Sequence, residues 1–244
     1  MQTGQAGAPA ARLCGKEHVR TIPALSGPMT NMLGAGQPGG TAVKRALAGA
    51  AALAAAGAAA AWWWYEAAPY PYSHRWMLNR QVPFLTNRRI DALLAARPGE
   101  RILEIGCGTG LQTLNVAAQV GEQGRLDIVD VQQQMLDHVM EQAKEREMTQ
   151  VVPSLADATA LPFEDNSFDA AYIITALGEI PDSAATVREL GRVLKPGGRL
   201  VVGECFERHF VSYVTLLHYA NDAGLAPTVT LGPPAAYLAQ FRAR

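Results

Sequence analysis

An acidic residue followed by three alternate glycines closes a short apolar run near the middle of the chain. The segment 103–110 reads LEIGCGTG. The run 101–105 predicts a buried strand, the glycines a sharp turn, and 111–120 a helix that begins at the turn. Each glycine removes a side chain that would keep the backbone away from a ligand or forbid the angles of the turn. A helix N-terminus behind such a turn is typical of α/β proteins that bind a nucleotide-like cofactor.

The spacing of these glycines distinguishes two kinds of cofactor. The dinucleotide fingerprint G-x-G-x-x-G would need a third glycine where this chain has Leu111. The pattern is instead E-x-G-x-G-x-G, formed by Glu104, Gly106, Gly108 and Gly110. It resembles motif I of the class I S-adenosylmethionine-dependent methyltransferases. The resemblance implies that these residues shape the site for the methionine part of S-adenosylmethionine.

Two further acidic positions follow the turn in the order that this family shows. The strand predicted over 125–129 ends at Asp130, where an acid can accept both ribose hydroxyls of a nucleoside. An ordinary strand-end aspartate, or an N-cap for the next helix, is the alternative for Asp130. Asp157 begins the run DATALPF, which resembles the family's D-A-x-x-L-P-F segment. The resemblance implies that Asp157 accepts from the adenine amino group and that the N–H of Ala158 meets the ring.

A fourth segment, 188–200, reads RELGRVLKPGGRL and resembles the helix, turn and strand that follow in the same family. We expect Pro196-Gly197-Gly198 to stop the helix and to start the strand. The four segments place the resemblance between about 101 and 204. The residues expected at the cofactor are Glu104, Gly106, Cys107, Gly108, Gly110, Asp130, Val131, Asp157, Ala158 and Thr175.

The remaining pattern predicts an α/β fold, a Rossmann-like doubly wound sheet of seven strands. The sheet is mostly parallel, with one antiparallel strand near the C-terminal edge, as the resemblance implies. Pro153 lies in a short predicted strand and is tolerated only at a sheet edge, where the family has its third strand. Further strands are expected over 168–174 and 199–204 and a closing hairpin over 227–231 and 236–241, with helices over 132–145 and 209–223.

Three segments precede the predicted catalytic domain, 99–244. Residues 1–43 are rich in glycine, proline and alanine without periodicity and are expected to be disordered. Residues 44–66 form an Ala-rich apolar helix, a candidate membrane anchor. Its run 46–65 has about 20 residues, the length of a bilayer span, and ends in WWWY like an interfacial belt. Because alanine inserts weakly, a span, an interfacial anchor and a soluble helix all stay open.

The lead-in segment 67–98 combines aromatic residues with one predicted helix. Thr86 is placed to cap that helix, whose apolar face carries Ile90, Leu93 and Leu94. In the resembling family such a segment folds over cofactor and acceptor as a lid. We expect the group 72–76 to form a wall on the acceptor side, with ordinary core packing as the alternative.

The net charge and the cysteine content limit the partners and the cellular compartment that fit this chain. A net charge of −1 argues against a nucleic-acid partner, which requires a basic excess. The three cysteines form no C-x-x-C pair, so no metal site is expected and a reducing cytoplasm fits. If 46–65 contacts a membrane, the catalytic domain must be on the cytoplasmic side with its cofactor. The four arginines between 75 and 89 outweigh Lys44 and Arg45, which permits that orientation.

Methyl transfer from a sulfonium makes few demands on catalytic side chains. The charged sulfur becomes a neutral thioether, so that positioning of the acceptor supplies most of the catalysis. A general base is needed only for an acceptor that loses a proton. Weak candidates at the carboxyl ends of the strands are Glu179, Glu204 and His209. Asp182 and Tyr213 also qualify by position, with helix capping as the alternative for Asp182.

The sequence therefore predicts an S-adenosylmethionine-dependent methyltransferase with a small-molecule or lipid-like acceptor. The run TALGEIPD after the strand 168–174 differs from the signature of amide and adenine methylation, which disfavours nucleic-acid bases and protein glutamine. A quinone-ring or phospholipid-headgroup methyltransferase at the membrane is the specific alternative. A nicotinamide-dependent oxidoreductase and a non-catalytic cofactor-binding module are the alternatives from other classes. The sequence does not indicate an oligomeric state.

Overall fold

The computed structural model describes residues 40–65, 69–79, 82–206 and 209–244. The chain divides into two compact units, 1–52 and 53–244. The segment predicted to be disordered is 1–43, and its residues 1–39 lie outside the described residues. Residues 40–43 are helical, contrary to that prediction. They belong to α1, which begins two positions after Pro38, and no further proline interrupts this helix.

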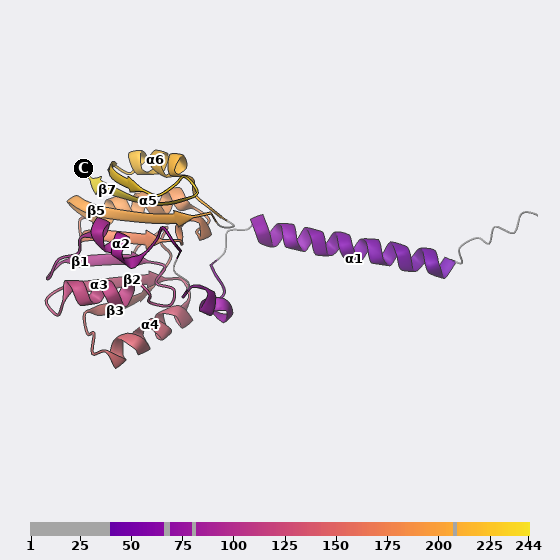
Figure 1. The fold of residues 1–244 in the computed structure, drawn as a ribbon, viewed down its shortest axis with the longest axis horizontal. Helices are drawn as coiled ribbons and strands as arrows, with labels where there is room; N and C mark the ends of the chain where they lie inside the picture. Colours follow the sequence, from indigo (N-terminus) through magenta and orange to yellow (C-terminus); the bar gives the residue numbers. More distant parts are fainter. Residues whose placement is uncertain (1–39, 66–68, 80–81, 207–208) are drawn as a thin grey trace, which may run out of the picture. The chain divides into compact units, whose positions relative to one another are not determined.

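Seven strands form one sheet in the order β3-β2-β1-β4-β5-β7-β6 (Figure 1). Neighbours among the first five strands are parallel, whereas β7 is antiparallel to both β5 and β6. The predicted fold class is therefore confirmed. The strands are β1 (Arg101–Ile105), β2 (Arg125–Asp130), β3 (Val151–Leu155), β4 (Phe168–Ile174), β5 (Leu194–Cys205), β6 (Leu225–Leu231) and β7 (Ala236–Ala243).

Helices cover both faces of the sheet, because successive residues of each parallel strand point to opposite sides. Leu103 and Ile105 pack in the cluster that includes α5 and α6, while Ile102 packs in the cluster that includes α2, α3 and α4. The helical elements are α1 (Gly40–Tyr65), η1 (Tyr72–Met77), α2 (Asn87–Leu94), α3 (Thr113–Val120), α4 (Gln133–Glu145), η2 (Leu177–Glu179), α5 (Ser183–Val193) and α6 (Tyr213–Asp222).

The junction between α5 and β5 differs from its prediction. The helix ends at Val193, before the tripeptide 196–198 that was expected to stop it, and β5 begins at once with Leu194. Leu194 pairs with Phe168, whereas Arg199 pairs with Ala170, so the residues between them form an irregularity within the strand. The proline and glycines therefore interrupt a strand that has already begun.

Two other helix starts lie later than predicted. Helix α6 begins at Tyr213 and not at 209, because the Ser212 hydroxyl caps it by accepting the N–H of Thr215 at 3.1 Å. Helix α3 begins at Thr113, two residues after the predicted start. Thr86 is the N-cap of α2 as predicted, although its side chain makes no capping hydrogen bond. The predicted apolar face of α2 is buried.

Helix α1 is apolar and exposed along its described length. Every described side chain from Val43 to Ala61 is exposed. By length and composition this stretch could cross a membrane, and it is the one such helix among the described residues.

Candidate active site

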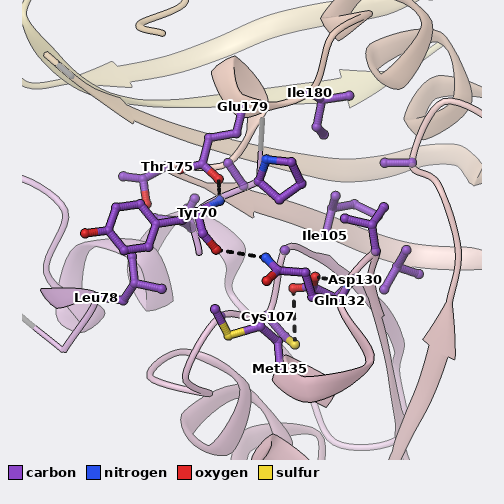
Figure 2. Close-up of a pocket in the computed structure, with 18 of the residues that line it drawn as sticks. Tyr70, Leu78, Ile105, Cys107, Asp130, Gln132, Met135, Thr175, Glu179 and Ile180 are labelled. Carbon is purple, nitrogen blue, oxygen red and sulfur yellow. Dashed lines mark hydrogen bonds between the residues drawn. The ribbon is translucent and has the colours of Figure 1, made fainter. Parts of the chain in front are cut away.

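A cavity lies at the carboxyl ends of β1, β2 and β4, where open α/β sheets bind ligands (Figure 2). The glycine turn after β1 forms one wall, and the segments after β2, β3 and β4 form the others. Residues before and after η1 complete the lining. Eight of the ten predicted cofactor residues line this cavity: Gly106, Cys107, Gly108, Asp130, Val131, Asp157, Ala158 and Thr175.

The glycine turn has a backbone that only glycine adopts easily. Gly106, Gly108 and Gly110 have φ values of 72°, 50° and 81°. A Cβ atom on Gly106 would lie 2.7 Å from the Cβ of Ala176, so a side chain there would clash with the loop after β4. The N–H of Gly106 donates to the carbonyl of Val129 at 2.8 Å, which fixes the turn to β2.

Gly110 and Glu104, the other two predicted cofactor residues, are not among the residues that line the cavity. A Cβ on Gly110 would lie 3.3 Å from Val139 on α4, so this glycine allows the turn to pack on a helix. Glu104 is 3 % exposed and accepts a hydrogen bond of 2.6 Å from the hydroxyl of Thr113. Burial raises the pKa of Glu104 to about 8. Its role in this structure is to tie α3 to β1 behind the turn.

Asp130 ends β2 and presents its carboxyl group to the cavity. Its Oδ1 accepts the backbone N–H of Gln132 at 2.9 Å, and its Oδ2 accepts from the Cys107 thiol at 3.8 Å. Burial raises the pKa of Asp130, and the N–H groups of Gln132 and Gly108 oppose that shift. The N-cap of α4 is Gln132, so Asp130 ends β2 without capping that helix. Each carboxylate oxygen has two lone pairs, which leaves acceptor capacity for a ligand hydroxyl.

The thiol of Cys107 is held in its protonated form. Its side chain is buried, and burial raises the pKa of the thiol far above its usual range, with Glu104 and Asp130 adding to the shift. A thiolate nucleophile is therefore unavailable at this position near neutral pH. The contribution of Cys107 to the wall is its backbone and a weak hydrogen bond to Asp130.

The turn after β3 brings Asp157 and Ala158 to the same cavity. Asp157 is exposed, and its Oδ1 accepts from the backbone N–H and the hydroxyl of Thr159, both at 2.8 Å. Ala158 is buried beside it. The N–H of Ala156 donates to the carbonyl of Asp130 at 3.2 Å, which joins this turn to the end of β2. Two acidic side chains from neighbouring strands thus line one side of the cavity.

A segment that contains η1 crosses from one side of the cavity to the other. We call residues 69–78 the strap. The N–H of Tyr70 donates to Oε2 of Glu179 at 2.8 Å, and the carbonyl of Tyr70 accepts from Nε2 of Gln132 at 2.9 Å (Figure 2). Glu179 follows β4 and Gln132 follows β2, so one residue of the strap connects two edges of the cavity.

The residues 72–76, predicted to form a wall on the acceptor side, are not among the residues that line the cavity. Tyr72 packs edge-on against His138 of α4, with ring centroids 6.4 Å apart, and Trp76 is 63 % exposed. The strap lines the cavity instead through Pro69, Tyr70 and Leu78. The residues that flank the short 3-10 helix η1 line the cavity, whereas the residues within it do not.

Of the three catalytic candidates, Glu179 is the one that lines the cavity. Glu204 is fully buried near the end of β5, in register with Tyr237 of β7. His209 precedes α6, and its backbone packs against Gly178. Neither of these two residues is part of the cavity wall.

The two further candidates have structural partners. Asp182 is the N-cap of α5, as the alternative reading required, and accepts the N–H of Ala185 at 2.8 Å. The Tyr213 hydroxyl accepts from Thr230 at 2.8 Å. Sequence reasoning missed Gln132, whose position at the start of a helix and two residues after Asp130 was the available signal.

The model of the ubiE/COQ5 methyltransferase family matches residues 81–220 of this chain. Among curated proteins, a demethylmenaquinone methyltransferase of Staphylococcus saprophyticus is 38% identical over 114 residues, which are 47% of this chain and 48% of the relative. The enzyme of the same name from Bacillus cereus strain AH187 is 32% identical over 121 residues, 50% of this chain and 51% of the relative. The matches thus span about half the length of these relatives.

Solved structures share the fold at low sequence identity. A SAM dependent methyltransferase from Aquifex aeolicus superposes with a TM-score of 0.64 at 19% identity, over 72% of this chain and 100% of that chain. The [4+2]-cyclase SpnF superposes with a TM-score of 0.58 at 22% identity, over 64% of this chain and 78% of that chain. A methyltransferase and a cyclase thus share this fold, so the fold alone does not determine the reaction.

Proposed function

Because the chain belongs to the ubiE/COQ5 methyltransferase family, we propose that it transfers a methyl group from S-adenosylmethionine to a lipid-like acceptor of the quinone type. The observation that carries the proposal is the cavity itself. Its wall combines a glycine turn with the carboxyl groups of Asp130 and Asp157. This set of groups suits a cofactor that has an uncharged nucleoside and a cationic methionine part, because no phosphate has to be bound.

Particular residues would hold the cofactor. Asp130, at the end of β2, would accept the ribose hydroxyls, and Asp157 with the N–H of Ala158 would meet the adenine. The backbone of Gly106 and Gly108 would lie against the methionine part, because both residues belong to the turn that lines the cavity. When bound, S-adenosylmethionine supplies a methyl group on a positively charged sulfur that leaves as a neutral thioether.

A quinone-type acceptor is supported by the relatives and by the lining of the cavity. Two of the similar curated proteins carry the name demethylmenaquinone methyltransferase. The wall also contains apolar side chains suited to a flat, uncharged ring: Leu78, Ile105, Val129, Ile174 and Ile180. A phospholipid headgroup is the second lipid-like candidate from the sequence, and the polar acceptor would find fewer partners in this lining.

Methylation of a quinol ring carbon requires that one ring proton leaves as the new carbon–carbon bond forms. Glu179 is placed to receive that proton, because it lines the cavity on the side of the strap. The N–H of Tyr70 donates to its Oε2 and so fixes the orientation of the carboxyl group. The apolar walls and the strap would keep water from the reacting carbon.

The proposed function is tested by a methyl-transfer assay on the full chain. Purified protein in mild detergent is mixed with methyl-labelled S-adenosylmethionine and a reduced demethylmenaquinone with a short side chain. We expect label in the quinol and an equal amount of S-adenosylhomocysteine. Phosphatidylethanolamine in place of the quinol separates the headgroup alternative. Absence of S-adenosylhomocysteine with either acceptor, from protein that binds S-adenosylmethionine, would contradict the proposed acceptor class.

A further inference from the structure

We propose that the carboxyl edge of the sheet, which carries the cavity, faces a lipid bilayer into which α1 inserts, so that the acceptor enters from the lipid. The part of the proposal that concerns the acceptor rests on the proposed function. The test measures the orientation of the protein on the membrane and not its activity. Three observations carry it: the composition of α1, the short connection from α1 to the strap, and the distribution of exposed apolar side chains between the two edges of the sheet.

Helix α1 lacks the polar face of a surface helix. Between positions 46 and 61 the chain holds alanine and glycine apart from Leu47 and Leu53, and every described side chain from Val43 to Ala61 is exposed. An amphipathic helix lies in the membrane interface by means of a charged face, which this helix does not have over that stretch. A helix that is apolar all round is covered by lipid or by protein. Its length suits the hydrocarbon core of a bilayer.

The connection from α1 to the cavity is short. Helix α1 ends at Tyr65, and the backbone of Tyr70 is bound to Glu179 and Gln132 at the cavity. Five residue steps span at most about 18 Å, whatever path they take. A domain of this size is roughly 40 Å across. If α1 is inserted in a membrane, the carboxyl edge must therefore lie near the membrane surface. The amino edge could lie there only if the hydrogen bonds of Tyr70 to Glu179 and Gln132 were broken.

Large apolar side chains are exposed at the carboxyl edge. Val131 follows β2, Leu155 ends β3 and Phe206 follows β5, and Phe206 is 81 % exposed. Trp76, within the strap, is also exposed. The first three side chains come from segments that meet at one edge, because the carboxyl ends of parallel strands lie together. Such an apolar patch marks an interaction surface.

The opposite edge has a different surface. The turns at the amino ends of the strands expose polar residues such as Glu122, Glu147 and Asn166. None of the exposed large apolar side chains among the described residues belongs to these turns. The two edges thus differ in the way expected of a protein with one side toward lipid and one toward water. A bilayer is the occupant that both α1 and this edge fit.

Fluorescence quenching by lipid tests the orientation. Leu155→Cys places a fluorophore at the carboxyl edge, and Glu122→Cys places the same fluorophore at the amino edge as the matched control. Both changes are made in the full chain with Cys14→Ser and Cys205→Ser, and Cys107 is left in place because it is buried. The probe is a vesicle of phosphatidylcholine and phosphatidylglycerol in equal parts, with a nitroxide attached to the lipid. Circular dichroism confirms that each variant folds.

We expect the chain to sediment with the vesicles and the Leu155→Cys fluorophore to be quenched several-fold more than the Glu122→Cys fluorophore. Equal quenching in vesicle-bound protein, stronger quenching at Glu122→Cys, or failure to bind vesicles would each overturn the proposal. Calorimetric binding of S-adenosylmethionine and methyl transfer in detergent are measured on the same samples. A chain that passes those two assays but fails the quenching test retains the proposed function and loses this inference.

A linker insertion tests whether the short connection sets the orientation. An insertion of about 30 glycine and serine residues after Tyr65 would lengthen the connection by roughly 30 Å on average. The matched control carries the same insertion before Gly40, which leaves the distance from α1 to the strap unchanged. We expect the first insertion to reduce the contrast between the two fluorophores and the second to preserve it. A contrast that survives both insertions would overturn the role of the connection.

Discussion

At the scale of single residues, the three acidic residues of the motifs differ in burial. Two of them line the cavity, and the third is buried behind the glycine turn. Asp130 and Asp157 reach the cavity wall, whereas Glu104 is enclosed behind the turn and bound to Thr113. All three occupy motif positions that the sequence resemblance assigned to the cofactor. The pattern identified the motif, but it could not show that Glu104 is bound to Thr113 and buried, because that contact depends on how α3 packs against β1.

Asp130→Ala should weaken binding of S-adenosylmethionine by at least about tenfold, or about 1.4 kcal/mol. The reason is the loss of a carboxylate that accepts two hydroxyl groups. Isothermal titration calorimetry measures the effect. Asp137→Ala is the matched control, since this aspartate is exposed on α4 away from the cavity wall. Equal affinities for the two variants would remove Asp130 from the proposed site.

Glu104 should make stability depend on pH. Its pKa is raised from 4.5 to about 8 in the folded protein, so the folded state holds this proton more tightly than the unfolded chain. The resulting stability is complete below pH 4.5 and is lost as pH rises to about 8, with a slope of at most about 1.4 kcal/mol per pH unit. Urea denaturation across this window should show a flatter profile for Glu104→Gln than for the wild type. Identical slopes would contradict the prediction.

At the scale of elements, the glycine turn and the strap determine the shape of the cavity. The turn was evident in the sequence, because glycine spacing reports backbone angles directly. The strap was not evident in the sequence. Its two hydrogen bonds use the backbone N–H and carbonyl of Tyr70, which every residue type except proline has. Strand positions other than the start of β5 were predicted closely, because apolar runs mark them. Helix starts were less accurate, because caps such as Ser212 depend on local geometry.

Gly106→Ala should abolish measurable binding of S-adenosylmethionine and lower stability. The new methyl group would lie 2.7 Å from Ala176, at a φ of 72°. Gly224→Ala separates the two effects, because Gly224 has the same φ of 72° with no atom within 4 Å of the added Cβ. Backbone strain alone costs about 1–2 kcal/mol. We expect both variants to lose stability in thermal melts, and binding to be lost only in Gly106→Ala.

Two substitutions of Glu179 separate its function as a base from its contact with the strap. Glu179→Gln keeps an oxygen that can accept the N–H of Tyr70 but cannot take a proton. It should lower kcat for a quinol acceptor and leave KM nearly unchanged. Glu179→Ala removes both functions and should raise KM as well, with faster proteolysis within residues 69–78. If Glu179→Gln retains full kcat, the proton leaves by another route.

At the scale of the whole molecule, α1 and the α/β domain contribute differently. Removal of residues 1–65 should leave the thermal unfolding temperature within error of the full chain, because the described side chains of α1 from Val43 to Ala61 bury nothing. The same deletion should abolish sedimentation with vesicles. Differential scanning fluorimetry and a vesicle spin assay measure the two effects. A large drop in unfolding temperature would mean that the helix stabilises the domain.

The order of the strands has a consequence for synthesis of the chain on the ribosome. β7 is the last strand of the sheet to be made, yet it lies between β5 and β6. Until β7 emerges, β5 presents an open edge of apolar residues that nascent neighbours can pair with. β6 meanwhile has no partner among the strands made before it. Sheet closure is therefore a late event in translation, and the growing chain should depend on chaperones until its final strand is inserted.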